Sequence, residues 1–328
     1  MLGKLLTLPE IFNNTVSRIP DYQRGYAWSD KELQDFWDDL DLLSSHSSQP
    51  HYVGVLTLEK VPQDALALVL GNGQEWLQDG GQQFFYVVDG QQRLTTILIL
   101  LFELIKWHKA LSPMSQALTA GEDRDSVMSK YIRCEKKLVP QVFGYRLGYA
   151  CDDQTDAFLR REVFEDRSVS QSIKQSAYTQ NLLNAKKFFA DKLRKMPTTV
   201  DLQGRFKLIV ERLRFNTFGV DSDLDVCMTF EAINNRGKPL SDLEKLKSRL
   251  IYLAGLLAGH DSNRLAVYRK QINDRWKKVY GLLGWSPEVQ LDDDEFLNLT
   301  WIIYFGRYGD IPRADHLFKQ QFFPRTIL

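Results

Sequence analysis

The sequence predicts an α+β protein, with strands mainly in the first third of the chain and a mainly α-helical remainder. Two β-rich runs, residues 52–61 and 84–88, precede residue 90, whereas strand signals are few beyond residue 110. Residues 112–125 (SPMSQALTAGEDRD) combine Pro, Gly, Ser and charge, as linkers do. We therefore expect one domain over residues 1–111 and a helical domain over residues 112–328.

The expected elements of the first domain follow from local patterns. Residues 19–28 (IPDYQRGYAW) carry Pro, Asp and Gly and predict a loop, after which a helix capped by Ser29 or Asp30 begins. A polar, glycine-rich loop over residues 71–83 separates the two β-rich runs, and a helix over about residues 91–109 follows the second run. The buried side of the helix after Ser29 is expected to carry Leu33, Phe36, Trp37, Leu40 and Leu43.

The second domain is expected to contain helices and one isolated strand. Residues 212–220 alternate in polarity and predict that strand, and residues 225–234 predict a helix. A further helix follows, because Ser241 and Glu244 match a capping box. Its apolar residues fit helical spacing: Leu243, Leu246, Leu250, Leu253 and Leu257.

Length and composition are those of a folded, water-soluble chain. The 328 residues exceed what one compact core usually absorbs, which favours two domains. Hydrophobic residues make up 44% and charged residues 26%, so long disordered regions are not expected. Lys+Arg and Asp+Glu both number 42, so any affinity for nucleic acid must come from local basic patches.

The sequence shows no membrane span, signal peptide or metal-binding pattern. The apolar run LTTILILLFELI is interrupted by Glu103 and is shorter than the ~20 residues of a membrane helix, and the N-terminal apolar run is too short for a signal peptide. The three cysteines are far apart, and the five histidines have no zinc-ligand spacing. We expect reduced thiols in a cytoplasmic protein and no protein-only metal site.

The stretch VVDGQQRLTT places five polar or small residues between a strand and a helix. An exposed helix start attracts anions, and Gly90 would let a phosphate approach the backbone, with Arg93 able to pair with it and Gln91 and Gln92 adding donors. The structural alternative makes Asp89 the N-cap and Gln92 its capping-box partner, which stabilises by about 1 kcal/mol. The two interpretations are compatible.

Three further stretches have both a functional and a structural interpretation. Tyr22, Gln23 and Arg24 suit stacking on a base and bonding to phosphate, or a proline-anchored loop whose aromatic residues pack on the core. Residues 264–280 contain six basic residues and one acidic residue, which suits a nucleic-acid backbone or a solvated helix face. A turn that ends a helix, with a glycine as the left-handed residue, is expected at Asn234, Asn235, Arg236 and Gly237.

The polar stretches together resemble a known family. IPDYQRGYAW, VVDGQQRLTTILILL and FEAINNRGKPLSDLEKLKSRLI occur in this order, with HYVGVLTLEK between the first two and FGYRLGYACDDQTDAFLRREVF after them. This combination resembles the N-terminal domain of GmrSD-type and SspE-type anti-phage restriction proteins, over most of residues 8–310. The resemblance implies a ParB/sulfiredoxin-like nucleotide-binding domain with a small mixed sheet, followed by a helical domain.

In that family the Asp-Gly-Gln-Gln-Arg motif is linked to binding and hydrolysis of a nucleoside triphosphate. The resemblance therefore assigns this role to Asp89, Gly90, Gln91, Gln92 and Arg93, with Tyr22, Gln23 and Arg24 beside them. The base, in GTP, ATP or CTP, is left open. In related proteins, nucleotide turnover is coupled to sensing DNA with modified bases or backbone phosphorothioate, and a nuclease domain cuts the DNA.

The working hypothesis is hydrolysis with Mg²⁺ bridging the phosphates. Arg93 would neutralise developing charge, Asp89 would orient water or a metal-bound water, and Gln91 or Gln92 would position the attacking water. Arg24 is the second candidate phosphate contact. A non-enzymatic module that binds a DNA phosphate or a modified nucleotide without turnover is the alternative. A sulfiredoxin-like reductase is rejected, because it needs a cysteine where this motif has glutamines.

The chain departs from the full-length pattern in its nuclease domain. That domain normally carries a His-Asn-His metal site, whereas His260 and His316 stand alone here. We therefore expect that this chain alone does not cut DNA and that a nuclease domain or partner chain does. The helical domain is expected to serve as a homodimer surface, a DNA contact or a relay to the nuclease. In the last case residues 234–237 would reach back to the nucleotide.

Overall fold

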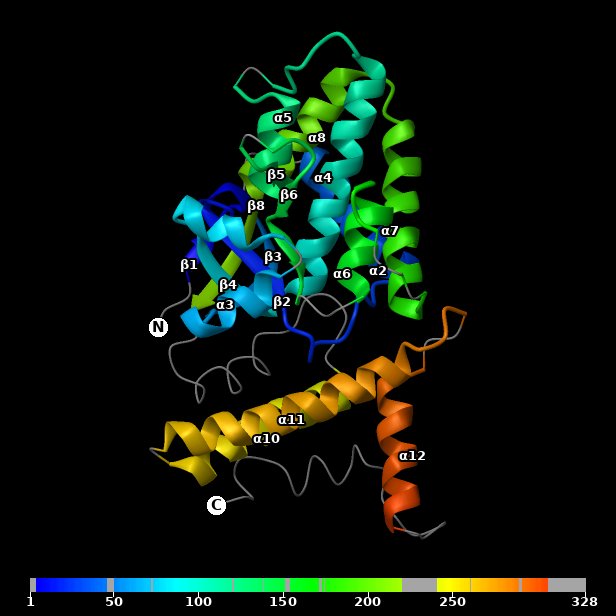
Figure 1. Ribbon diagram of the computed structural model, residues 1–328. Helices are drawn as coiled ribbons and strands as arrows, with labels where there is room; N and C mark the ends of the chain where they lie inside the picture. The colour runs from blue at the N-terminus through cyan, green and yellow to red at the C-terminus, as the bar shows by residue number, and fades with distance from the viewer. Residues whose placement is uncertain are drawn as a thin grey trace. The chain divides into compact units, whose positions relative to one another are not determined.

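A six-stranded mixed sheet forms the framework of the computed structural model of this chain (Figure 1). The structure describes residues 4–45, 50–71, 73–119, 121–137, 139–150, 154–170, 173, 175–219, 241–259, 261–288 and 291–305. The strands run in the order β1 (Lys4–Leu6), β8 (Leu213–Gly219), β3 (His51–Lys60), β4 (Gln83–Asp89), β2 (Thr15–Ile19) and β7 (Leu147–Tyr149). The pairs β8–β3, β4–β2 and β2–β7 are parallel, and β1–β8 and β3–β4 are antiparallel. The expectation of an α+β fold with a mixed sheet is confirmed.

Helices and short turns complete the N-terminal part. The helices are α1 (Leu8–Ile11), α2 (Asp30–Ser45), α3 (Leu66–Leu70), α4 (Gln91–Leu111), α5 (Arg124–Val127), α6 (Gln154–Phe158), α7 (Ala177–Arg194) and α8 (Thr199–Arg212). Short 3-10 turns cover η1 (Gln63–Ala65) and η2 (Glu75–Gly80), and π-helical turns cover η3 (Met128–Ile132) and η4 (Leu159–Val163). A small second sheet pairs β5 (Arg133–Glu135) with β6 (Phe143–Tyr145).

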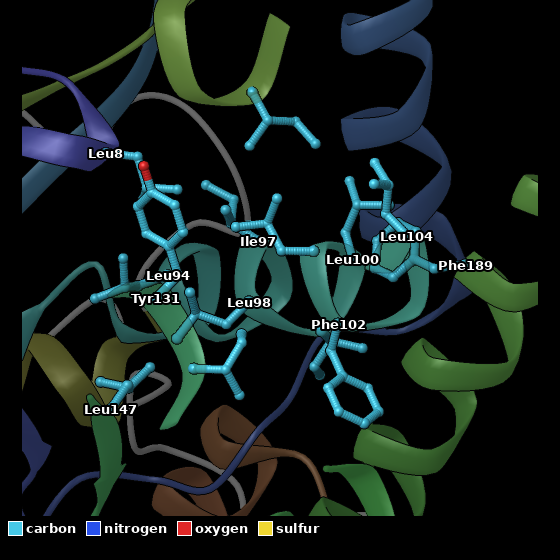
Figure 2. Close-up of a cluster of buried hydrophobic side chains, with 14 of the residues drawn as sticks. Leu8, Leu94, Ile97, Leu98, Leu100, Phe102, Leu104, Tyr131, Leu147 and Phe189 are labelled. Carbon is cyan, nitrogen blue, oxygen red and sulfur yellow. The ribbon is translucent and has the colours of Figure 1, made fainter. Parts of the chain in front are cut away.

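Helix α4 is the centre of the hydrophobic core. Its side chains from Leu94 to Ile105 are all buried and mostly apolar, so the helix is enclosed on all sides, as a central helix is. Figure 2 shows α4 side chains among residues of several other elements, including Leu8 of α1, Leu147 of β7 and Phe189 of α7. The start of α4 is therefore held in place by the main core of the protein.

Helix α2 shows why the sequence folds as it does beside this core. Leu33 and Leu40 are fully buried, and Phe36 and Trp37 are nearly so, while Leu43 packs partly buried against the same cluster. The side chain of Glu32 accepts hydrogen bonds from both the backbone N–H and the hydroxyl of Ser29, at 2.8 and 2.7 Å. The expected start and buried side of this helix are confirmed.

The six-stranded sheet contains strands from both sides of the expected domain boundary. Strands β7 and β8 come from beyond residue 112 and pair with β2 and β3. The chain divides into two compact units, Met1–Val220 and Asp221–Leu328, whereas the expected boundary lay between residues 111 and 112. Residues 212–220 were expected to form an isolated strand. That expectation is wrong, because β8 lies inside the sheet, between β1 and β3.

The described helices of the second unit are α10 (Asp242–Ala258), α11 (Ser262–Leu283) and α12 (Asp293–Phe305). The capping box of Ser241 and Glu244 is present at the start of α10. Leu243 is buried in a cluster with Trp276, Tyr280, Leu283 and Leu297. Leu257, which also fits the helical spacing, is 68% exposed. The helix expected over residues 225–234 lies outside the described residues.

Candidate functional site

The two sequence motifs emerge at the same edge of the sheet. Strands β2 and β4 are parallel, with Val16 opposite Phe84 and Arg18 opposite Tyr86. Their carboxyl ends are therefore neighbours. The loop of residues 20–29 leaves β2 there, and Asp89 ends β4. Ligands of such sheets commonly bind outside the carboxyl ends of the strands.

Gly90 is the N-terminal capping residue of α4, and it has the left-handed conformation, with φ of 88°. A Cβ at this position would lie 2.7 Å from the backbone oxygen of Val55 in β3, so both the conformation and the close approach require glycine. Gly90 has no side chain with which to cap the helix, and the expectation that Asp89 is the N-cap residue is wrong. The left-handed turn at Gly90 leaves Asp89 as the last strand residue, opposite Thr57.

The start of α4 consequently has the features of an anion site. The first N–H groups of a helix lack partners within the helix and carry partial positive charge. The cap residue, a glycine, offers them no side-chain acceptor. The helix is 21 residues long and buried, so these groups are fixed in direction.

Arg93 adds a fixed cation in the first turn of this helix. Its side chain is only 8% exposed. Burial lowers the pKa of Arg93, while the nearby Asp89 and Tyr52 raise it. An arginine remains protonated in proteins. The positive guanidinium of Arg93 therefore lies near the carboxyl group of Asp89 and the phenol of Tyr52.

Gly54 makes room for this guanidinium. Its φ is 147°, and a Cβ there would lie 2.8 Å from both Cζ and Nη1 of Arg93. The register of β3 against β8 shifts between Tyr52 and Gly54, so the strand is irregular at this point. Neither Tyr52 nor Gly54 was predicted from the sequence to be a site residue. A glycine inside the β-rich run HYVGVLT was the available signal, because such a glycine marks a bulge or a close approach.

The glutamines of the motif bind the backbone of the loop of residues 20–29. The carboxamide of Gln92 accepts from the N–H of Ala27 at 2.9 Å and donates to the oxygen of Gly25 at 3.0 Å. Gln91 Nε2 donates to the oxygen of Arg24 at 3.3 Å. Gln23 Nε2 donates in turn to the oxygen of Val88 at 3.0 Å. The two motifs are therefore joined by side-chain-to-backbone hydrogen bonds in both directions.

The aromatic residues of this loop divide between core and surface. Tyr26 is 1% exposed and Trp28 is 6% exposed, and both belong to the main hydrophobic core. The Tyr26 hydroxyl lies 2.6 Å from Thr96 Oγ1 in α4. Arg24 is also buried, whereas Tyr22 and Gln23 are half-buried. The structural interpretation therefore holds for Tyr26 and Trp28.

Helix α7 supports the same loop from outside the motifs. Asn181 Nδ2 donates to the backbone oxygen of Tyr26 at 3.1 Å. A Cβ at Gly25 would lie 2.4 Å from Cγ of Tyr178, so the tyrosine ring rests on the glycine. More than 150 residues separate these partners along the chain, and no local pattern in the sequence signals such a contact.

The other residues that the sequence suggested for a functional site lie outside the described part of the chain. Asn234, Asn235, Arg236 and Gly237 lie outside the described residues, as do His260 and His316. Within the described ranges, no group of three or more His, Cys, Asp or Glu side chains is placed to hold a metal ion. Within the same ranges, no helix has the length and apolar character needed to cross a membrane.

The fold and this edge define an α+β protein whose central helix begins after a glycine N-cap and places a buried arginine at the carboxyl ends of two parallel strands. The model of the family described as the GmrSD restriction endonuclease, N-terminal domain, matches residues 8–251. The chain belongs to this family, and it is thus a component of a restriction system. No curated protein matches the sequence.

Proposed function

We propose that the start of α4 binds the phosphates of a nucleoside triphosphate and that the chain hydrolyses it. In this proposal the chain is the sensor of a bacterial anti-phage restriction system, and it couples turnover to recognition of modified DNA and to control of a nuclease. The observation that carries the proposal is the burial of Arg93 beside Asp89 in the first turn of a helix whose N-cap residue is glycine.

The chemistry of the donors supports a phosphate ligand. The N–H groups of the first turn and the guanidinium of Arg93 are both donors to anions, and Gly90 adds no side-chain acceptor at the helix start. Gly54 keeps the side of β3 free of a Cβ where Arg93 lies. Arg24, in the loop that the glutamines hold, is the second candidate cation.

The residues present also fit a magnesium ion. Mg²⁺ is commonly bound through one or two carboxylates together with substrate phosphates, and Asp89 supplies a carboxylate beside Arg93. When bound, the ion would neutralise phosphate charge. In this proposal Asp89 holds the ion or orients the attacking water, and Arg93 stabilises charge that develops on the phosphate oxygens.

The contacts of the glutamines bear on their role. Gln92 uses both ends of its carboxamide on the loop backbone, so its proposed part is to hold the loop rather than to position water. Gln91 has one end engaged, and its Oε1 is buried with no hydrogen-bond partner among the described residues. Of the two, Gln91 is therefore the better candidate for contact with an attacking water or with the ligand.

A titration with fluorescent GTP, ATP and CTP in the presence of Mg²⁺ tests the site. Arg93→Ala should weaken binding of the preferred nucleotide at least tenfold, and Arg93→Lys should weaken it less, because lysine keeps the charge but not the bidentate geometry. Arg124→Ala is the matched control. It removes a side chain that is 3% exposed and bonded to Gln116 and Ser112, away from the site. Unchanged affinity in Arg93→Ala would remove the assignment.

The second candidate is a module that binds a DNA phosphate or modified nucleotide without turnover. The engagement of both glutamine side chains with the loop backbone favours it, because the site then has fewer groups left to direct water. Binding that depends on Arg93 without phosphate release would support this candidate over the NTPase. The partner nuclease, a homodimer and a relay through residues 234–237 remain proposals under either function.

A further inference from the structure

Helix α11 concentrates the positive charge of an otherwise neutral chain. It contains six cations, Arg264, Arg269, Lys270, Arg275, Lys277 and Lys278, and one anion, Asp274. Its net charge is therefore +5. The whole chain has a formal net charge of zero, so the rest of the chain carries −5. Such segregation creates a local positive field that the overall composition hides.

Five of the six cations are exposed, while the opposite face of α11 is packed. Trp276, Tyr280 and Leu283 are buried against residues of α10 and α12. Arg264, Lys270, Arg275, Lys277 and Lys278 are all exposed. The helix is thus fixed through its apolar side and presents its basic side to solvent.

Three of the lysines share one small area of this face. Lys270 Nζ lies 2.8 Å from Asp274 Oδ2, and their side chains are 76% and 57% exposed. The hydrogen bond from Lys270 holds the pKa of Asp274 below its ordinary value, and the charges of Lys277 and Lys278 lower it further. Asp274 thus lies among three ammonium groups of the same helix.

We infer that the exposed face of α11 binds the phosphate backbone of duplex DNA without reading its sequence. Residues 270–278 advance by about 12 Å along the helix axis, at about 1.5 Å per residue. Phosphates on one DNA strand recur about every 3.4 Å along the duplex axis. This segment carries four cations, Lys270, Arg275, Lys277 and Lys278. Their positive charge is opposite in sign to that of the phosphates that one strand presents over the same length.

DNA is the polyanion that fits the family, because restriction systems act on DNA. The inference rests on that membership and not on the nucleotide site, which lies in the other compact unit. It also differs from recognition of a modified base. Contacts to phosphates position a protein on a duplex and carry no sequence information.

The test is fluorescence anisotropy of an unmodified duplex of about 25 base pairs, titrated with the full chain between about 50 and 200 mM salt. The variant replaces the four cations with glutamine, and circular dichroism checks its helix content. Each lost phosphate contact should reduce the slope of log K against log salt by about 0.9. We expect a slope shallower by about 2 to 4 and an affinity at least tenfold lower at about 100 mM salt.

Two controls separate this surface from overall charge and from the nucleotide site. Glutamine at Lys31, Lys109, Lys187 and Lys207, which are exposed on α2, α4, α7 and α8, removes the same charge elsewhere and should leave the slope unchanged. Arg93→Ala should weaken nucleotide binding at least tenfold and keep the DNA slope.

Three results would overturn the inference. The first is a wild-type chain that does not bind the duplex, and the second is an equal loss of slope in both glutamine sets. The third is polyglutamate that competes as well as DNA, which would assign the face to an acidic protein. A variant with Lys270→Arg, Lys277→Arg and Lys278→Arg keeps the charge and should preserve binding. Together with the circular dichroism of the glutamine variant, this result separates a loss of charge from misfolding.

Discussion

The guanidinium group of Arg93 lies against Gly54, with no room for a Cβ between them: a methyl group on Gly54 would come within 2.8 Å of Cζ. This contact links the middle of β3 to the first turn of α4. Burial of Arg93 disfavours its charge, and Asp89 and Tyr52 oppose that effect. The position of the cation is therefore set by a glycine that lies 39 residues earlier in the chain.

Gly54→Ala should displace Arg93 and weaken the proposed nucleotide site. The added methyl group requires the buried guanidinium to move, and the φ of 147° adds a backbone cost of about 1–3 kcal/mol. We expect at least a tenfold loss of nucleotide affinity in a fluorescence titration. Gly81→Ala is the control, because its φ is 66° but nothing lies within 4 Å of its Cβ. Equal affinities in the two variants would show that Arg93 does not need this space.

Gln92→Ala should destabilise the protein by about 1–3 kcal/mol, because two backbone groups of the loop lose their partner. Urea unfolding followed by circular dichroism measures the change. Gln180→Ala is the matched control, since its carboxamide bonds to Asn184 on an exposed helix surface and its loss should cost less than about 0.5 kcal/mol. A loss of the same small size in both variants would mean that Gln92 does not hold the loop.

A charged cluster of Glu165, which follows η4, with lysines of α4 and α7 gives a prediction for acid stability. Glu165 Oε1 accepts from Lys106 at 2.5 Å and from Lys186 at 2.9 Å. Burial raises the pKa of Glu165, but the two lysines outweigh this and bring it below its ordinary value of 4.5. A carboxylate with a lowered folded-state pKa stabilises above its unfolded-state pKa, and the effect is lost as the pH falls through the folded-state value.

Glu165→Gln should therefore lower the melting temperature at pH 7, and the difference from wild type should vanish well below pH 4.5. The side chain is 47% exposed, so the loss should be only about 0.5–1 kcal/mol. Asp191→Asn removes an exposed pair with Arg194 and serves as the control, with a smaller effect. A difference that grows on acidification would contradict the assigned direction of the pKa shift.

The sequence predicted the elements whose signals are local. The helices that begin near Asp30 and Gln91 and the strands near residues 52–61 and 84–88 follow from periodicity and turn residues, and the structure has all four within a few residues. The capping box at Ser241 is another local signal that was interpreted correctly. The signal for each of these elements is either a capping or turn motif of residues fewer than five positions apart or a periodic pattern of apolar residues.

Features that depend on distant partners were missed or misplaced. Strand β8 was expected to be isolated, because the alternation of polar and apolar residues predicts a strand but not its pairing with β1 and β3. Strands β5, β6 and β7 have three residues each, which is too short to show a period. The N-cap was assigned to Asp89 from residue type, but the left-handed turn at Gly90 decided it. Asn181 and Tyr178 reach the loop only through the tertiary fold.

The most direct test of the proposed function is phosphate release from GTP, ATP, CTP and UTP with Mg²⁺, with and without modified DNA, for wild type and Arg93→Ala. If α4 begins at a hydrolytic site, at least one nucleotide is hydrolysed by the wild-type chain, and Arg93→Ala loses at least a hundredfold in rate, or about 2.7 kcal/mol of transition-state stabilisation. Equal release by the two proteins, or none by wild type with any nucleotide or DNA, would contradict hydrolysis at the start of α4.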